Sequence, residues 1–600
     1  MSEPVPHGHA GPMPRQLYGR LALGWLAVCA LFILASAGAI AHWRFPDPDD
    51  TLRLVQVRDL LAGQGWYDLV QHRLDAPDGG VPMHWSRLVD VPIALAILLA
   101  RPFLGEGGAE GFALIFVPLV TFGVAMVLLA RFAWRHLERD DIFYVCVAFA
   151  MSVPVMAQLR PLRIDHHGWQ IVCALVAVNA LMSRSPRIGG WVVGAALATW
   201  LSISIEGLPL AAAICGVAAL RWLREDGEST WFVATIQGLG AASVILFAAT
   251  RGTADVIEHC DAISPIHVGI FVAGALGATA LGRLRNPPVA VRLAGLGGLA
   301  AMALAILWLV APQCTSGAFI GLDPLVDKYW YANVTEGLPI WRQDISTAAG
   351  ILVPGVISLW ATLQLARLSS GSARRWWQDY GLMLLASFAI AVLVARAGAV
   401  LGALAAVPIG WQVRRWLIAL RSVRNPARRS FALASIAVAL VPTAPVTLVG
   451  LVVPARAFAA LGSEDPALAP PKVSDCDLAQ GARVLDKLPR GEILSPLDIA
   501  PELLYRTRQT VIASGHHRGA KAMHVTIATF LATPDDAHGT LVQRGTRYVA
   551  ICPDLNEPQL YREGSPHGLM ADILADKAPK WMNPVRVRGD GSLEIWRIES

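Results

Sequence analysis

Long apolar runs recur along most of this chain, and they restrict its possible folds more than any other feature. A helix needs roughly 20 apolar residues to cross about 30 Å of hydrocarbon. Runs of about this length follow one another as far as residue 453. Hydrophobic residues make up 54% of the 600 positions, charged residues make up 16%, and the mean hydropathy is +0.48. The sequence therefore predicts a polytopic α-helical membrane protein.

We expect about 13 transmembrane helices. The predicted spans are 20–42, 109–133, 142–158, 168–183, 188–204, 207–222, 231–250, 264–282, 289–311, 346–367, 379–396, 398–418 and 430–453. The first span is long and lacks a small-residue cleavage site, so we interpret it as an uncleaved anchor. The apolar stretch from Val91 to Leu104 is too short to cross comfortably, so we expect an interfacial helix there.

The distribution of basic residues predicts the orientation. Arginines cluster in alternate loops, which places those loops in the cytoplasm. The outer side then receives the loops at 43–108, 159–168 and 312–345, together with the C-terminal segment. Abundant Gly, Ala and Arg are typical of a bacterial source. We therefore expect an inner (plasma) membrane protein whose active site and C-terminal domain face the periplasm.

The composition changes near residue 455. Pro454, Pro466, Pro470 and Pro471 mark a linker, and short β-rich runs between helical segments follow it. The division predicted is a transmembrane domain at 1–454 and a soluble α/β domain at 455–600. Strands are expected at 492–495, 510–513, 547–552 and 593–598.

Four of the eight cysteines fall outside the predicted spans or at their outer edges. Cys260 and Cys314 lie by outer loops, and Cys476 and Cys552 lie in the C-terminal domain. An oxidising compartment permits two disulfides among them, and the sequence leaves the pairing open.

The first outer loop begins with a carboxylate cluster, Asp47-Pro-Asp-Asp-Thr-Leu-Arg53. Carboxylates beside a membrane could hold a divalent cation and orient the nucleophile of an acceptor. The alternative is helix capping by Asp49 or Asp50, with Pro48 as a turn former. Asp49, Asp50, Arg53 and, further along the loop, His84 are secondary candidates.

The second outer loop carries Asp165-His166-His167 at the start of an apolar helix. Carboxylate oxygen and imidazole nitrogen are ligands for Mn²⁺, Fe²⁺ or Zn²⁺, and the preceding Arg160 and Arg163 suit a phosphate. The alternative is that the histidines are interfacial residues and that Asp165 caps the helix.

Three further polar segments are weaker candidates. The C-terminal domain offers Ser495-Pro-Leu-Asp498 and Ser514-Gly-His-His-Arg518. The second is polar enough to bind a sugar or phosphate or to cover the membrane site, and a solvated turn is its alternative. His516, His517 and Arg518 are therefore secondary candidates. Glu206-Gly-Leu-Pro209 could be a substrate-contacting break at the outer end of a span, and a short turn between two helices is the preferred interpretation.

The order of these motifs resembles the catalytic subunits of oligosaccharyltransferases, which are GT-C membrane glycosyltransferases, and the archaeal type most of all. The family's first loop carries patterns like Asp47 to Arg53 and Pro82 to Asp90, and its second loop carries Asp-His-His. Its flexible-loop glutamate motif looks like Asn333-Val-Thr-Glu-Gly-Leu-Pro339.

The resemblance implies Asp47, Asp165 and His167 as ligands of a divalent metal, Mn²⁺ or Mg²⁺. It implies Asp47, Asp165 and Glu336 as catalytic residues, and Arg160 or Arg163 as a contact of the donor phosphate. The implied reaction is inverting transfer of a glycan from a polyprenyl phosphate or diphosphate to an acceptor on the outer face.

Two departures concern the acceptor. The family's soluble domain carries a Trp-Trp-Asp motif that reads a sequon, and no such motif follows residue 455; Arg375-Trp-Trp-Gln-Asp-Tyr-Gly381 falls in a predicted cytoplasmic loop. Gln170 stands where archaeal-type members tend to have glutamate. We therefore expect an acceptor other than a sequon asparagine.

The expected partners are the polyprenyl-linked donor, membrane lipids and a glycan, lipid or protein acceptor, with no nucleic acid.

Two other functions fit the same sequence. One is a GT-C transferase that uses a monosaccharide on polyprenyl phosphate to modify a lipid or polysaccharide. The other is a transporter or flippase of lipid-linked glycans. The acidic motifs gather on one side and the sequence shows no internal repeat, which disfavours alternating access. A third possibility is a scaffold without catalytic activity. The joint presence of Asp47, Asp165, His167 and Glu336 would then be a coincidence.

Overall fold

The computed structural model describes residues 8–9, 11–317, 319, 321–445, 476–587 and 593–599. The chain forms two compact units, and neither is continuous in sequence. The first unit comprises Met1–Arg44, Ser86–Ala318 and Thr335–Leu468, and the second comprises Phe45–Trp85, Phe319–Val334 and Ala469–Ser600. The domain boundary at 454/455 stays a prediction, and the linker prolines and the end of the span predicted at 430–453 lie outside the described residues.

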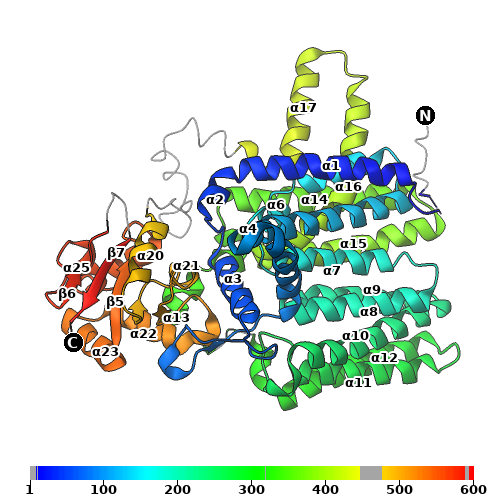
Figure 1. Ribbon diagram of the computed structural model, residues 1–600. Helices are drawn as coiled ribbons and strands as arrows, with labels where there is room; N and C mark the ends of the chain where they lie inside the picture. Colours follow the sequence, from blue (N-terminus) through cyan, green and yellow to red (C-terminus); the bar gives the residue numbers. More distant parts are fainter. Residues whose placement is uncertain are drawn as a thin grey trace. The chain divides into compact units, whose positions relative to one another are not determined.

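The first unit is a bundle of helices, many of which lie side by side in Figure 1. They are α1 Arg15–Ala35, α2 Ala37–His42, α4 Arg87–His136, α5 Asp141–Ala150, α6 Val153–Leu159, α7 His167–Ala180, α8 Pro186–Ile203, α9 Leu208–Arg224, α10 Ser229–Thr250, α11 Pro265–Gly282, α12 Val289–Val310, α14 Ile345–Leu368, α15 Gly371–Leu393, α16 Gly398–Leu420 and α17 Pro426–Leu440.

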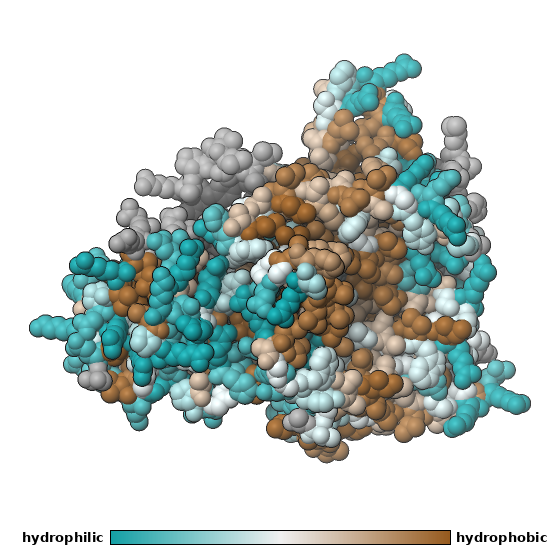
Figure 2. All heavy atoms as spheres, in the orientation of Figure 1, coloured by the Kyte–Doolittle hydropathy of each residue, from teal (hydrophilic) through white to brown (hydrophobic). Residues whose placement is uncertain are grey.

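Within the described residues, nine helices are long and apolar enough to cross a membrane, or ten if the bent pair α5 and α6 forms one span. The protein is thus an integral membrane protein, as predicted. The count of about 13 spans stays a prediction, and α7, with 14 residues, is short for a span. Figure 2 shows hydrophobic residues covering broad areas over these helices.

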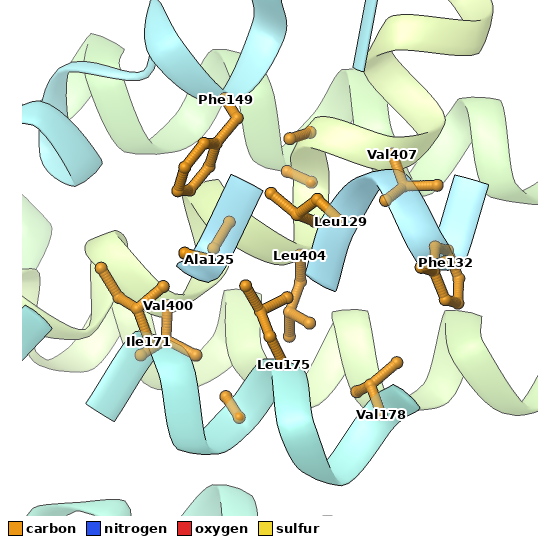
Figure 3. Close-up of a cluster of buried hydrophobic side chains, with 14 of the residues drawn as sticks. Ala125, Leu129, Phe132, Phe149, Ile171, Leu175, Val178, Val400, Leu404 and Val407 are labelled. Carbon is orange, nitrogen blue, oxygen red and sulfur yellow. The ribbon is translucent and has the colours of Figure 1, made fainter. Parts of the chain in front are cut away.

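Among the candidate spans in the described residues, the one that contains α16 is the most buried, since 89% of its most apolar 18-residue stretch lies inside the structure. Its small residues allow neighbouring helices to approach closely. A Cβ added at Gly410 would lie 2.4 Å from the backbone nitrogen of Val145 in α5. Figure 3 shows part of the core that α16 forms with its neighbours, where Val400 lies near Ile171, and Leu404 lies near Leu129 and Leu175.

Two predicted elements differ from the structure. The span expected at 142–158 is two helices, α5 and α6, bent by 68°. The stretch from Val91 to Leu104 is helical as expected, but it forms the first part of α4, which breaks at Gly105 (φ 70°, ψ −178°) and continues into the next predicted span. Its interfacial position stays a prediction. Glycine adopts this backbone conformation without steric cost.

The second unit contains a five-stranded sheet in the order β4-β3-β5-β7-β6. Strands β4, β3 and β5 are parallel, and β7 is antiparallel to both β5 and β6. The strands are β3 Glu492–Leu494, β4 Thr510–Val511, β5 Thr546–Ile551, β6 Met582–Pro584 and β7 Glu594–Ile598. All four expected strands are present, whereas β6 was missed. The predicted fold class, a helical membrane bundle with a C-terminal α/β region, is confirmed.

Helices of the C-terminal region cover this sheet. They are α20 Leu478–Lys487, α21 Ala500–Arg506, α22 Ala520–Leu531, α23 Pro534–Arg544, α24 Asn556–Gly564 and α25 Leu569–Leu574. Two segments from elsewhere in the chain join them. Helix α13, Pro324–Tyr329, buries Val326 and Tyr329 in the same core.

The first loop is the other joining segment. It forms α3, Pro48–Leu61, which packs against α21, and a hairpin of β1, Val70–Gln71, and β2, Val81–Pro82. The loop extends the sheet edge, because the backbone N–H of Val511 donates to the carbonyl oxygen of Arg73 at 3.0 Å. The Arg73 guanidinium also donates to the carbonyl oxygens of Leu504 and Thr507, each at 2.9 Å.

Two disulfides form, and each lies within one unit. Cys260 pairs with Cys314, and Cys476 pairs with Cys552. These are the four cysteines that the sequence placed outside the predicted spans, and the structure supplies the pairing that the sequence left open.

Candidate active site

The Asp-His-His segment lies in a tight turn between α6 and α7 of the first unit. Leu162 has φ 71°, which is uncommon for a residue with a side chain, and its backbone N–H donates to the carbonyl oxygen of Leu114 at 2.9 Å. Gly168 follows the histidines, and a Cβ there would lie 2.9 Å from the Leu159 side chain. The turn therefore returns the chain closely against the end of α6.

Asp165, His166 and His167 are all buried and form one cluster. Asp165 Oδ1 lies 2.7 Å from His166 Nδ1, and Asp165 Oδ2 lies 3.5 Å from His167 Nε2. One candidate ligand atom from each residue lies within 4.8 Å of the others. The cap position of α7 is His166, which makes no side-chain capping bond. The expected alternative of a capping Asp165 is therefore wrong, because that carboxylate contacts the imidazoles instead.

The donor set of this cluster fits a divalent transition metal. Imidazole nitrogen with carboxylate oxygen suits Mn²⁺, Fe²⁺ or Zn²⁺, whereas Mg²⁺ prefers oxygen ligands and retained waters. Of the two metals expected, Mn²⁺ accepts an imidazole ligand more readily than Mg²⁺ does. Burial alone would lower the pKa of His166, but the charges of Asp165 and Glu206 outweigh burial and raise this pKa to about 9.

A chain of alternating charges leads away from the cluster. Glu206 Oε2 lies 3.9 Å from His166 Nε2, and Glu206 Oε1 lies 2.7 Å from Arg396 Nη1. Glu336 continues the chain, since its oxygens lie 3.6 Å from Arg396 Nη1 and 4.0 Å from Arg163 Nη2. The predicted residues Arg163, Asp165 and Glu336 thus belong to one network.

Arg396 was missed by sequence reasoning. It lies in the short turn Ala395–Ala397 between α15 and α16. A lone arginine between two apolar helices was a usable signal, because ionisable residues at such places are costly and usually paired. For Glu206, a turn between two helices was preferred over a substrate-contacting break. It does lie in the turn Ile205–Gly207, and its carboxylate also joins the network.

The two arginines proposed for a donor phosphate differ in their surroundings. Arg163 is buried and its Nε donates to Gln158 Oε1 at 2.9 Å. Arg160 is exposed at the C-cap of α6. Arg163 is therefore the arginine whose guanidinium the fold fixes beside Glu336.

Gln170 connects the cluster to α8. Its Oε1 accepts a hydrogen bond from Trp200 Nε1 at 3.1 Å, which leaves its NH₂ group facing His167 Nδ1 at 3.4 Å. This NH₂ group can donate to Nδ1 in one tautomer of His167, whereas metal binding through Nε2 requires the ring proton on Nδ1. A glutamate at this position would instead accept a proton from Nδ1 and free Nε2 to bind a metal.

In the second unit, Asp47 caps α3. Its Oδ1 accepts the backbone N–H of Asp49 at 2.9 Å, and Pro48 is the first helical residue. The expectation that Asp49 or Asp50 would be the cap is therefore wrong, because the helix begins two residues earlier. Asp50 and Arg53 are fully buried, and the Arg53 guanidinium lies 4.6 Å from the Trp85 ring centroid.

The negative charge of Asp47 also affects the pKa of a carboxylate in the C-terminal region. Desolvation by surrounding protein atoms and the charge of Asp47 raise the pKa of Asp498 to about 6. Burial and the charge of Asp498 raise the pKa of Glu557 to about 8. Glu557 accepts the backbone N–H groups of Leu497 at 2.7 Å and Asp498 at 3.0 Å, and the Tyr561 hydroxyl at 2.5 Å. Glu557 was missed by sequence reasoning.

The remaining secondary candidates also meet in the second unit. His84, His516 and His517 approach one another, with one ligand atom from each within 4.8 Å of the others. The Arg518 guanidinium donates to the carbonyl oxygen of Met83 at 3.4 Å. The alternative of a solvated turn at 514–518 is wrong for His516, which is only 3% exposed.

No protein-family model matches the sequence, and no curated protein matches it. Solved structures do match. The archaeal oligosaccharyltransferase AglB from Archaeoglobus fulgidus, in complex with an inhibitory peptide and a dolichol-phosphate, aligns with a TM-score of 0.60 at 13% identity, over 93% of this chain and 72% of that chain.

Two other structures of the Archaeoglobus fulgidus enzyme are similar. One is tethered to an acceptor peptide containing the NVT sequon, with a TM-score of 0.60, 13% identity, and coverage of 96% of this chain and 74% of that chain. The other is a complex with Zn and sulfate, with a TM-score of 0.59, 13% identity, and coverage of 95% and 73%. At this identity the likeness establishes the fold: the chain is built like an archaeal oligosaccharyltransferase of the GT-C type, as its motifs implied.

Proposed function

We propose that this protein is a GT-C glycosyltransferase that moves a glycan from a polyprenyl phosphate or diphosphate to an acceptor at the outer face of the bacterial inner membrane. The observation that carries the proposal is the charged network of Asp165, His166, Glu206, Arg396, Glu336 and Arg163 in a bundle with the oligosaccharyltransferase fold.

Asp47, Asp165 and His167 are the proposed metal ligands, as the motif resemblance implies. A divalent metal bound there would offset the negative charge on the leaving phosphate. Arg163 and Arg396 supply further positive charge for the same phosphate. Glu336 holds the two guanidiniums in position by lying between them.

Asp47 is proposed to orient the attacking group of the acceptor. Its carboxylate accepts a backbone N–H at the start of α3, so its orientation is fixed by the helix. The acceptor attacks the anomeric carbon from the side opposite the leaving phosphate, which inverts the configuration there.

We propose that the acceptor is not a sequon asparagine. No Trp-Trp-Asp motif follows residue 455, and the side chains of Ser514-Gly-His-His-Arg518, in the turn after β4, pack against His84 and Met83. A lipid, glycolipid or polysaccharide acceptor fits this polar, basic turn.

The test compares cells with the wild type, a deletion, Asp165→Ala and the control Asp140→Ala, in which an exposed carboxylate is removed. Mass spectrometry of lipid-linked glycans should show the same polyprenyl-linked species accumulating in the deletion and in Asp165→Ala only. Its mass separates a monosaccharide phosphate donor from an oligosaccharide diphosphate donor.

A second assay separates a transferase from a flippase. The purified protein in detergent micelles is incubated with the accumulated donor and a cell-envelope extract as acceptor. A transferase releases polyprenyl phosphate or diphosphate, because bond cleavage needs no membrane. A flippase releases none. Wild-type behaviour of Asp165→Ala in both assays would refute the assignment of this cluster.

A further inference from the structure

We propose that His84, His516 and His517 form a second transition-metal site, of the zinc class, within the second unit. The site would join the first loop to the turn after β4. This proposal does not depend on the proposed function, because it concerns metal binding by residues outside the Asp165 cluster.

The three rings converge from segments far apart in the sequence. Each pair of ring centroids is 4.9 Å apart. His84 Nδ1 lies 2.8 Å from His516 Nε2, and these two residues are separated by 432 positions. In a tetrahedral zinc site with Zn–N bonds of about 2.05 Å, the nitrogens lie roughly 3.4 Å apart. The spacing observed here therefore needs only small side-chain movements to surround an ion.

The protonation that this geometry requires also suits a metal. A hydrogen bond between two imidazoles needs one nitrogen to donate and the other to accept, so His84 and His516 cannot both be fully protonated while it exists. Three charged rings at this separation would also repel one another strongly. Neutral imidazoles present the lone pairs that zinc binds.

The surroundings hold the rings in place. His84 follows β2, where the N–H of Met83 donates to the carbonyl oxygen of Leu69 at 2.9 Å. The Trp85 ring meets His516 edge-on at 5.7 Å, and the Phe319 ring meets His517 edge-on at 5.0 Å. Ligands fixed by neighbouring side chains make a metal site precise.

The backbone of the turn is also closely packed. A Cβ added at Gly515 would lie 2.8 Å from Trp330 Nε1, and one at Gly519 would lie 3.3 Å from Val81. The N–H of Gly519 donates to the carbonyl oxygen of His516 at 2.8 Å, which closes the turn. His516 and His517 are therefore presented to His84 by a turn with little room to shift.

The ligand set also specifies the class of metal. Three imidazoles select Zn²⁺, Co²⁺ or Ni²⁺ over Mg²⁺ and Ca²⁺, which prefer oxygen. Three protein ligands leave a fourth position for water or an anion. The Arg518 guanidinium, bonded to the neighbouring Met83 carbonyl, favours an anion in that position.

The test is zinc binding by the full-length protein purified in detergent, stripped with chelator and titrated with Zn²⁺ alone. His517→Ala and the milder His517→Gln remove one ligand, and His567→Ala removes an exposed histidine of the same unit as the control. All variants are made in the Asp165→Ala background, so that zinc at the Asp165 cluster does not contribute.

We expect about one equivalent of zinc in the background protein and in His567→Ala, and at least a hundredfold weaker binding in both His517 variants. Co²⁺ in place of Zn²⁺ should give visible absorption bands that disappear with His517→Gln. Equal zinc affinity in the background protein and His517→Gln would overturn the proposal. So would binding of inorganic phosphate that needs His517 but no zinc, which would mark an anion site.

Discussion

The two histidine clusters differ in how they are built, and the difference shows what kind of chemistry each can support. Asp165, His166 and His167 are consecutive, and carboxylates and guanidiniums alternate around them. His84, His516 and His517 come from distant segments and are surrounded mainly by aromatic rings. The first cluster is suited to charge that changes during a reaction, and the second is suited to holding an ion in place.

Of the substitutions that test this difference between the two clusters, Asp165→Ala is expected to have the largest effect on activity. Loss of the carboxylate removes a proposed metal ligand and leaves His166 without its nearest negative charge. Transfer activity should fall by about a thousandfold, the upper range for removing one group that stabilises a transition state. Release of polyprenyl phosphate in micelles measures it, with Asp140→Ala as the control. A loss below tenfold would contradict a catalytic role.

Arg396→Ala should have the next largest effect. The guanidinium of Arg396 contacts the carboxylates of both Glu206 and Glu336. Without it, the two negative charges are no longer offset. We expect activity to fall by about a hundredfold, with partial recovery in Arg396→Lys, because lysine keeps the charge but loses the two-pronged geometry.

The control for Arg396 is Arg367→Ala, which removes an exposed arginine at the end of α14. Full activity in Arg396→Ala would show that the charged network is structural only.

Gln170→Glu should strengthen metal binding at the first cluster. A glutamate can accept the Nδ1 proton of His167 and free Nε2 as a ligand, and such supporting contacts change metal affinity by about tenfold or more. Titration with Mn²⁺ or Zn²⁺ in the His517→Gln background measures it. The exposed Gln313→Glu serves as the control. An unchanged affinity would mean that His167 is not a ligand through Nε2.

The smallest effect is expected in the second unit, at Glu557. Its raised pKa means that the folded protein binds a proton that the unfolded chain releases. Stability from this group is fully present below its ordinary pKa of 4.5 and is lost as pH rises through about 8.

The apparent melting temperature of the wild type should therefore decline by a few degrees between pH 5 and 8. Glu557→Gln does not titrate, so its decline should be smaller. The variant should also be less stable at every pH, because its NH₂ group faces the backbone N–H of Leu497 or Asp498. An equal slope in both proteins would show that Glu557 is ionised in the fold.

Sequence reasoning succeeded where the relevant information is local. Apolar runs predicted the helices, β-rich runs predicted four strands, and a contiguous motif located Asp165 and its neighbours. It failed where contacts join distant segments. Arg396 gives no pattern of its own and becomes meaningful only beside Glu206 and Glu336. The bend between α5 and α6 was missed because hydrophobicity continues across it.

The same limit explains the second unit. Nothing in residues 45–85 or 319–334 predicts that they share a core with the C-terminal sheet, because those contacts depend on shape rather than on periodicity. His84 could be placed in a motif, but its meeting with His516 and His517 could not be predicted.

The discontinuous second unit also has a consequence for biosynthesis. His84 meets a residue 432 positions later, so the first loop leaves the ribosome long before its packing partner exists. At 5–20 residues per second, the wait lasts about 20 to 90 s. During that time Leu52, Val55 and Trp85, which are buried in the finished protein, have no C-terminal partner to cover them. The core of this unit therefore cannot be completed until its C-terminal segment has been made.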